Sequence, residues 1–140
     1  MKKISLLLFA LFIFIKWSNA QCDKKVVWSS VKEEFLNDSG QVEHAGEDSV
    51  IIETSNTSVV VNHNNIPQDE LKGTVTGISC DWKEPYKNGR TTIKTNLTEA
   101  SGESNEGTIT IEGKDGQISI ILEVHGKRIK IYVAKYEEKS

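Results

Sequence analysis

Apolar and polar side chains alternate over long stretches of the second half of the chain, which is the pattern of half-buried β-strands. The positions that would share one face in three successive stretches are Ile109 and Ile111, then Ile118, Ile120, Leu122 and Val124, and finally Ile129, Ile131 and Val133. The pairs Asp115-Gly116 and His125-Gly126 separate these stretches. Both pairs favour tight hairpin turns, because glycine adopts positive φ at little cost. The pattern therefore predicts three consecutive antiparallel strands.

Weaker alternation upstream predicts the remaining strands. The segments with this character are 26–28, 50–53, 59–61, 74–82 and 91–97. Ser55-Asn56-Thr57 lies between two of them and is expected to form a hairpin turn, and the polar stretch Pro85–Gly89 is expected to form another.

Residues 31–37 fit two structures. Ser30 and Glu33 have the spacing of a helix capping box, and Val31 and Phe35 are four residues apart, which favours a short helix. An extended strand fits the segment as well. The strand is preferred, because one or two turns of helix are marginal without a packed face.

Together these segments predict an all-β domain of about eight strands joined by short connections, which is an antiparallel meander. An open meander would expose unpaired strand edges, so two closed forms are expected as alternatives. One is a closed up-and-down barrel, and the other is a sandwich of two sheets.

The N-terminus has the three parts of a secretory signal peptide. Lys2-Lys3 supplies the positive charge, residues 4–15 are almost wholly apolar, and Ser18-Asn19-Ala20 provides small residues at a cleavage site. The apolar stretch is shorter than the roughly 20 residues that a membrane-spanning helix needs. We therefore expect a signal peptide over 1–20, an exported single domain over 21–140 in the periplasm or outside the cell, and no membrane span after cleavage.

Two cysteines follow the predicted cleavage site, Cys22 and Cys80. An even number of cysteines in an exported chain favours a disulfide, so one Cys22–Cys80 bridge is expected. Cys22 also lies where a bacterial lipoprotein carries its lipid. Such signals end in Gly, Ala or Ser directly before the cysteine, whereas this chain has Gln21 there, so ordinary secretion is preferred over lipid anchoring.

The charge of the mature chain excludes one class of partner. The whole chain has 17 basic and 20 acidic residues. Three of the basic residues, Lys2, Lys3 and Lys16, lie in the predicted signal peptide, so 14 remain and acidic residues exceed them by six. An acidic surface without a basic stripe argues against nucleic acid as a partner. The domain is expected to be a monomer.

An exported eight-strand meander with a tryptophan early in its first strand, Trp28, resembles the small lipocalin-like and calycin-type barrels of Gram-negative envelopes. The segment Asn19-Ala20-Gln21 and the abundance of Lys, Asn, Glu and Ile are similar to those of short proteins exported by Bacteroidota. The resemblance implies a β-barrel that could hold a small ligand.

No catalytic residue, metal site or cofactor is predicted. The histidines His44, His63 and His125 fall in expected loops or turns, and none lies in a recognisable nucleophile or metal motif. The nearest approach to a metal site is Asn62–Asn65 followed by Asp69-Glu70, which offers oxygen ligands without the spacing of a calcium loop. The chain is therefore expected not to be an enzyme, with a hydrolase built on two carboxylates as a distant alternative.

Two functions remain. The first is an exported non-enzymatic β-module that binds a small ligand, a glycan or a protein, and its candidate contact residues are the aromatic side chains Trp28, Trp82, Tyr86 and Tyr132. The second is a protein-interaction or inhibitor module that acts through its loops. The polar loops expected for that role are Asp38–Ser49, Asn62–Glu70 and Glu99–Glu106.

Overall fold

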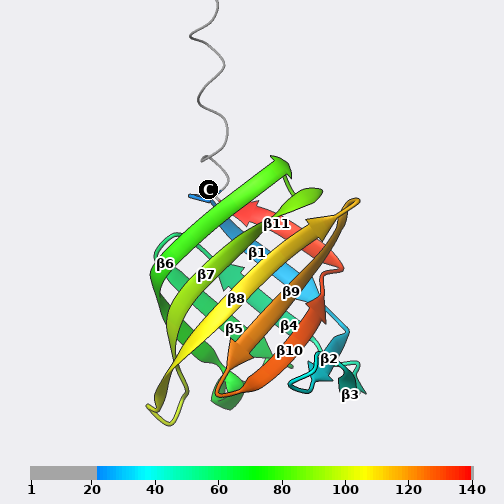
Figure 1. Cartoon of the computed structure of the whole chain (residues 1–140). Helices are drawn as coiled ribbons and strands as arrows, with labels where there is room; N and C mark the ends of the chain where they lie inside the picture. Colours follow the sequence, from blue (N-terminus) through cyan, green and yellow to red (C-terminus); the bar gives the residue numbers. More distant parts are fainter. Residues whose placement is uncertain (1–21, 140) are drawn as a thin grey trace, which may run out of the picture.

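The computed structural model describes residues 22–139, so the predicted signal peptide over 1–20 lies outside the described residues. The described residues form a single antiparallel sheet (Figure 1). Its strands are β1 (Lys25–Ser30), β2 (Glu33–Leu36), β3 (Val42–Gly46), β4 (Val50–Thr54), β5 (Ser58–His63), β6 (Leu71–Glu84), β7 (Asn88–Thr98), β8 (Ser104–Lys114), β9 (Gln117–Val124), β10 (Lys127–Tyr132) and β11 (Lys135–Lys139). A short 3₁₀ turn over Pro67–Asp69 is the one helical element between Cys22 and Lys139.

The all-β prediction is confirmed, and the segment that fitted either a helix or a strand contains the strand β2. The predicted number of about eight strands is not confirmed, because the sheet has eleven. Part of the difference between eight and eleven strands arises because two long extended segments are each interrupted and so count as two strands. Val31-Lys32 separates β1 from β2, and Val133-Ala134 separates β10 from β11. The expected loop Asp38–Ser49 is also wrong in part, since it contains β3.

The interruption between β1 and β2 has a local cause. The buried Ser30 hydroxyl oxygen accepts a hydrogen bond from the backbone N–H of Lys32 at 3.1 Å and lies beside the carbonyl oxygens of Lys32 and Tyr132. A serine side chain that bonds to nearby backbone groups competes with the regular strand ladder. The chain therefore leaves the ladder for two residues without burying unpaired polar groups.

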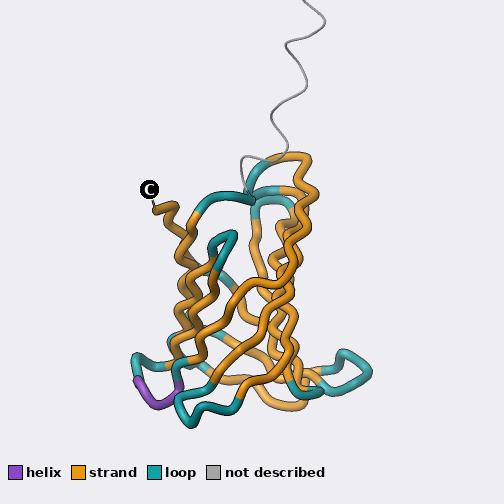
Figure 2. Tube along the Cα trace, turned by 90° about the vertical axis from the view of Figure 1, so that its left-hand side faces the viewer, coloured by secondary structure: helices purple, strands orange, loops and turns teal. Residues whose placement is uncertain are grey.

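The strands follow the order β11-β1-β4-β5-β6-β7-β8-β9-β10-β2-β3. From β4 to β10 each strand pairs with the next along the chain, which is the predicted meander. The closed barrel and the two-sheet sandwich are not confirmed by this linear order, in which β11 and β3 are the outer strands. Figure 2 shows that the strands run between two ends of the molecule and that the turns gather at both.

The three C-terminal strands confirm the firmest prediction. They are β8, β9 and β10, and Asp115 and His125 open the two turns between them with φ of 51° and 54°. Each is followed by a glycine, Gly116 at 82° and Gly126 at 70°. Two successive left-handed residues match the right-handed twist of antiparallel strands, which explains why these pairs form tight turns.

One face of the sheet carries the core. The buried hydrophobic residues are Val26, Trp28, Val50, Ile52, Val59, Val61, Ile93, Leu97, Ile109, Ile111, Ile118, Ile120, Leu122 and Ile131. Alternation predicted an inner face for the apolar side chains of the three C-terminal strands, and most of these side chains belong to the buried core. The other three, Val124, Ile129 and Val133, are partly buried and pack against the core. These side chains pack together, and the hollow beside Cys22, Trp28 and Trp82 holds only about 20 Å³.

The predicted disulfide is confirmed between Cys22 and Cys80, whose Cα atoms are 6.1 Å apart. It links the segment before β1 to the middle of β6 across 58 residues of sequence. A disulfide is compatible with an exported protein, because oxidising compartments preserve such bonds. Within residues 22–139 no helix has the length and apolar character needed to cross a membrane.

Candidate functional site

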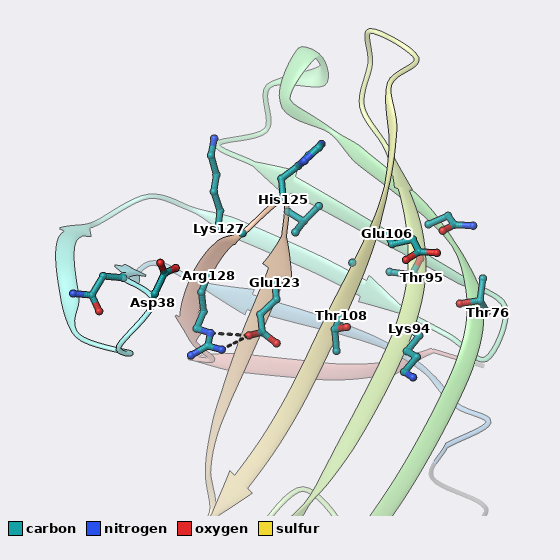
Figure 3. A pocket seen from close by; sticks show the side chains of 15 residues that line it. Asp38, Thr76, Lys94, Thr95, Glu106, Thr108, Glu123, His125, Lys127 and Arg128 are labelled. Carbon is teal, nitrogen blue, oxygen red and sulfur yellow. Dashed lines mark hydrogen bonds and ion pairs between the residues drawn. The ribbon is translucent and has the colours of Figure 1, made fainter.

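A groove with a volume of about 740 Å³ lies on the outer face of the sheet (Figure 3). Strands β6 to β10 form its floor. The turn at residues 125–127 and residues 37–38, which follow β2, form part of its rim. Its polar and charged lining residues are Asn37, Asp38, Thr76, Lys94, Thr95, Asn96, Glu106, Thr108, Glu123, His125, Lys127 and Arg128. We call this hollow the outer groove.

A row of cross-strand partners runs across the floor of the outer groove. Lys94 on β7 pairs with Thr108 on β8, and Thr108 pairs with Glu123 on β9. Glu123 in turn pairs with Arg128 on β10. Side chains that lie opposite one another on one face of a sheet are about 5 Å apart, so the row forms a continuous polar surface.

Two glycines and a β-bulge lie beside this row. Gly77 on β6 pairs with Lys94 and offers no side chain. A β-bulge shifts the register next to it, between Val75 and Gly77, and bulges commonly bend a strand at a binding surface. Gly107 also lines the groove, and a Cβ added there would point to the core side, within 2.9 Å of the buried Leu97 side chain.

The charges of the outer groove are of both signs and only partly paired. The Nε of Arg128 donates a hydrogen bond to Glu123 at 2.7 Å, as the dashed lines in Figure 3 mark. Across the part of the chain that the structure describes, the amino groups of Lys94 and Lys127 have no ion pair, and neither has the Glu106 carboxylate. The groove thus presents cationic and anionic groups that are available to a polar ligand.

Three of the four predicted contact residues lie together, at the end of the sheet that carries the disulfide. The ring centroids of Trp28 and Tyr86 are 5.8 Å apart, and those of Trp82 and Tyr86 are 6.1 Å apart. Tyr136, which the sequence reasoning missed, joins them with its centroid 4.7 Å from that of Tyr86. Tyr136 lies on β11, whose short charged sequence shows no alternation that would have drawn attention to it.

The polar side-chain atoms of Trp28, Trp82 and Tyr86 bond within the protein. The indole N–H of Trp28 donates to the Thr54 hydroxyl at 2.9 Å, and that of Trp82 donates to the Thr91 hydroxyl at 2.7 Å. The Tyr86 hydroxyl donates to Glu138 at 2.6 Å, which lowers the pKa of that carboxyl, as does the ammonium group of Lys24. Rings whose N–H groups bond within the protein are typical of packing, and here Trp28 is buried and Trp82 is partly buried.

Tyr132, the fourth predicted contact residue, lies apart from the aromatic cluster. Its hydroxyl donates to the Glu34 carboxylate at 2.7 Å, and this bond and partial burial raise the pKa of Tyr132. The ammonium groups of Lys32 and Lys130 lie 4.8 and 5.1 Å from its ring centroid. These contacts tie β2 to β10 on the outer face.

The three histidines occupy different places. His44 packs against Phe35 with ring centroids 5.7 Å apart, and His125 lies on the rim of the outer groove, 3.5 Å from Glu103. His63 instead bonds to the buried Glu33, thirty residues earlier in the chain. No sequence motif connects Glu33 with His63, since only the fold brings β2 to the end of β5.

Comparison of the chain with protein-family models, with curated proteins and with solved structures finds no match. The resemblance to lipocalin-like barrels therefore stays a prediction, and the site is interpreted from its geometry. That geometry defines an all-β protein with a packed interior and a polar groove of about 740 Å³ on the outside.

Proposed function

We propose that this protein is an exported, non-enzymatic interaction module that binds a polar segment of another protein in the outer groove. The observation that carries the proposal is the location of the free space. The interior void measures about 20 Å³, whereas the outer groove measures about 740 Å³. Ligand sites typically have volumes of 300–1,000 Å³, so the outer groove has the size of a site and the interior has not.

The chemistry of the outer groove favours a protein segment over an apolar molecule. Lys94 and Lys127 offer cationic groups and Glu106 an anionic one, while the floor is made of hydroxyl, amide and glycine groups. A polypeptide segment carries charges of both signs and backbone groups that hydrogen-bond, so it complements such a lining. The strands that form the floor are rigid, which limits the entropy lost on binding.

The alternative of a carrier for small apolar ligands has less support. A carrier of this kind encloses its ligand between the strands, as larger barrels do. Here the void beside Trp28, Trp82 and Tyr86 holds about 20 Å³, which is too little for a ligand of several non-hydrogen atoms.

Export in the proposed function is supported by the Cys22–Cys80 disulfide.

We also propose that the sheet closes on itself as a barrel that serves as the rigid scaffold. The pairing of β11 with β1 and of β10 with β2 supports this, because β1 continues into β2 and β10 into β11 after two residues each. Backbone bonds bridge the interruption, from the N–H of Tyr132 to the Lys32 oxygen at 3.2 Å and from that of Ala134 to the Ser29 oxygen at 2.9 Å.

Closure predicts slow amide hydrogen exchange at this seam. The amides of Tyr132 and Ala134 are expected to exchange at least about 100-fold more slowly than the exposed amide of Asp38, because opening them requires separation of the first and last strands. Exchange followed by NMR measures both rates. Exchange of the two seam amides as fast as that of Asp38 would indicate an open sheet.

Site-specific photo-crosslinking in the producing cells tests the function. A benzophenone amino acid at position 94, on the floor of the outer groove, is expected to form a discrete adduct with a second protein. The same amino acid at Lys135, an exposed position on β11 outside the groove, is the matched control. Adding Lys127→Glu to the position-94 protein is expected to reduce the adduct about tenfold, because it reverses one groove charge.

Two results would contradict the proposed function. One is an equal adduct from positions 94 and 135, which would mean that the groove is not the contact surface. The other is stoichiometric binding of a fluorescent fatty-acid analogue by the purified protein, which would require interior space that opens for an apolar ligand.

A further inference from the structure

Three potential metal ligands that are separated in the sequence lie close together in space. They are Glu33, Asp48 and His63. Glu33 begins β2, Asp48 lies between β3 and β4, and His63 ends β5. The Nε2 of His63 is 2.8 Å from the Oε1 of Glu33 and 3.9 Å from the Oδ2 of Asp48. The three ligand atoms all lie within 4.8 Å of one another.

These separations match the ligand shell of a small divalent cation. Zinc binds histidine nitrogen and carboxylate oxygen at about 2.0–2.2 Å in a tetrahedral arrangement, which places neighbouring ligand atoms about 3.3 Å apart. The two distances from His63 lie on either side of that value, at 2.8 and 3.9 Å. Small side-chain rotations would therefore bring one histidine and two carboxylates onto one ion.

Because the Glu33 carboxylate is buried, a nearby positive charge would stabilise it. The Glu33 side chain is only 2% exposed, and a buried carboxylate is costly unless a cation or several donors compensate it. Asp48 brings a second carboxylate to the same place, 3.9 Å from the Nε2 of His63. The side chains of His63 and Asp48 are 31% and 45% exposed, which leaves one side open to solvent for an ion and a bound water.

Neighbouring residues orient Asp48 towards the cluster. The Asn64 side-chain amide donates to the Oδ1 of Asp48 at 3.0 Å, and its oxygen accepts from the backbone N–H of Ser49 at 3.0 Å. The Oδ2 of Asp48 then faces His63. Gly46 leaves room for both carboxylates, since a Cβ there would lie 3.3 Å from Asp48 and 3.7 Å from Glu33. Such outer hydrogen bonds fix ligand orientation in metal sites.

We propose that Glu33, Asp48 and His63 form a Zn²⁺ site in which a water molecule takes the fourth position. The ion would join β2, the segment between β3 and β4, and the end of β5. Three protein ligands with one open position is the arrangement of zinc sites that keep an exchangeable ligand. The site does not depend on the outer groove, so the two proposals fail or succeed separately.

Calorimetric titration with ZnCl₂ tests the site on purified, metal-stripped protein that carries no histidine tag. The protein is expected to bind one equivalent, and His63→Ala is expected to weaken binding at least about 100-fold, because the nitrogen ligand is lost. Asn64→Gly keeps a residue suited to the positive φ of 52° and is expected to weaken binding about 10–100-fold. The matched control is His125→Ala, which removes an exposed histidine that also faces a glutamate, at 3.5 Å.

Two outcomes would overturn the proposal: no saturable Zn²⁺ binding by the unchanged protein, or equal binding by His63→Ala and the unchanged protein. The near-ultraviolet circular dichroism of the tryptophans reports whether each variant is folded. If His63→Ala does not fold, Asp48→Asn takes its place, because Asp48 is half-exposed. The same loss of Zn²⁺ affinity is expected. In the second of these outcomes, binding that His125→Ala weakens would assign the ion to the rim of the groove instead.

Discussion

Removing the disulfide with the double substitution Cys22→Ser and Cys80→Ser is expected to lower the free energy of unfolding by about 4 kcal/mol. The bridge closes a loop of 58 residues, so its loss restores a large conformational entropy to the unfolded chain. It also releases the segment before β1 from β6, next to the aromatic cluster around Tyr86. Urea unfolding followed by tryptophan fluorescence measures the change.

Reduction provides the control for this prediction. Dithiothreitol is expected to destabilise the unchanged protein by the same amount and to leave the double variant unaffected. A loss of stability below about 1 kcal/mol would contradict the expectation, since the chain-entropy model assigns several kcal/mol to a loop of this length.

Truncation of the core with Ile109→Ala is expected to lower the free energy of unfolding by about 2–5 kcal/mol. Ile109 has no exposed surface and lies on β8, next to the central strand β7 of the sheet order. Its side chain is surrounded by other core residues and the interior has almost no spare volume, so the deletion leaves a cavity rather than a relaxed core. Thermal or urea unfolding measures the loss.

Ile66→Ala is the matched control, because it deletes the same atoms from a side chain that is 40% exposed. Its expected cost is less than about 1 kcal/mol. Equal losses for the two variants would contradict the filled interior and would restore the carrier function as the stronger alternative. The two measurements therefore bear on function as well as on stability.

In the proposed function, the packed interior of the disulfide-linked scaffold leaves binding to the surface. The outer groove lies on the strands β6 to β10, and the proposed zinc site lies where β2, β5 and the segment before β4 meet. The aromatic cluster lies beside the Cys22–Cys80 disulfide instead. Of the aromatic side chains predicted as contacts, none lines the outer groove.

Much of the local structure could be predicted from the sequence, because a strand's pleat and a hairpin turn depend on neighbouring residues. The alternation at Ile118, Ile120 and Leu122 placed these side chains on the buried face, and the structure confirms it. Asp115-Gly116 predicted its turn for the same local reason. The disulfide was predictable because the expected mature chain has only two cysteines.

Only the tertiary structure decided the strand order, the interruptions and the sites. The outer groove depends on the register that brings Lys94 opposite Thr108 and Glu123 opposite Arg128, and alternation alone does not fix register. The contact of Glu33 with His63 joins residues 30 positions apart, and nothing in either local sequence encodes it. Local patterns determined which face each side chain occupies, whereas non-local pairing determined which side chains meet.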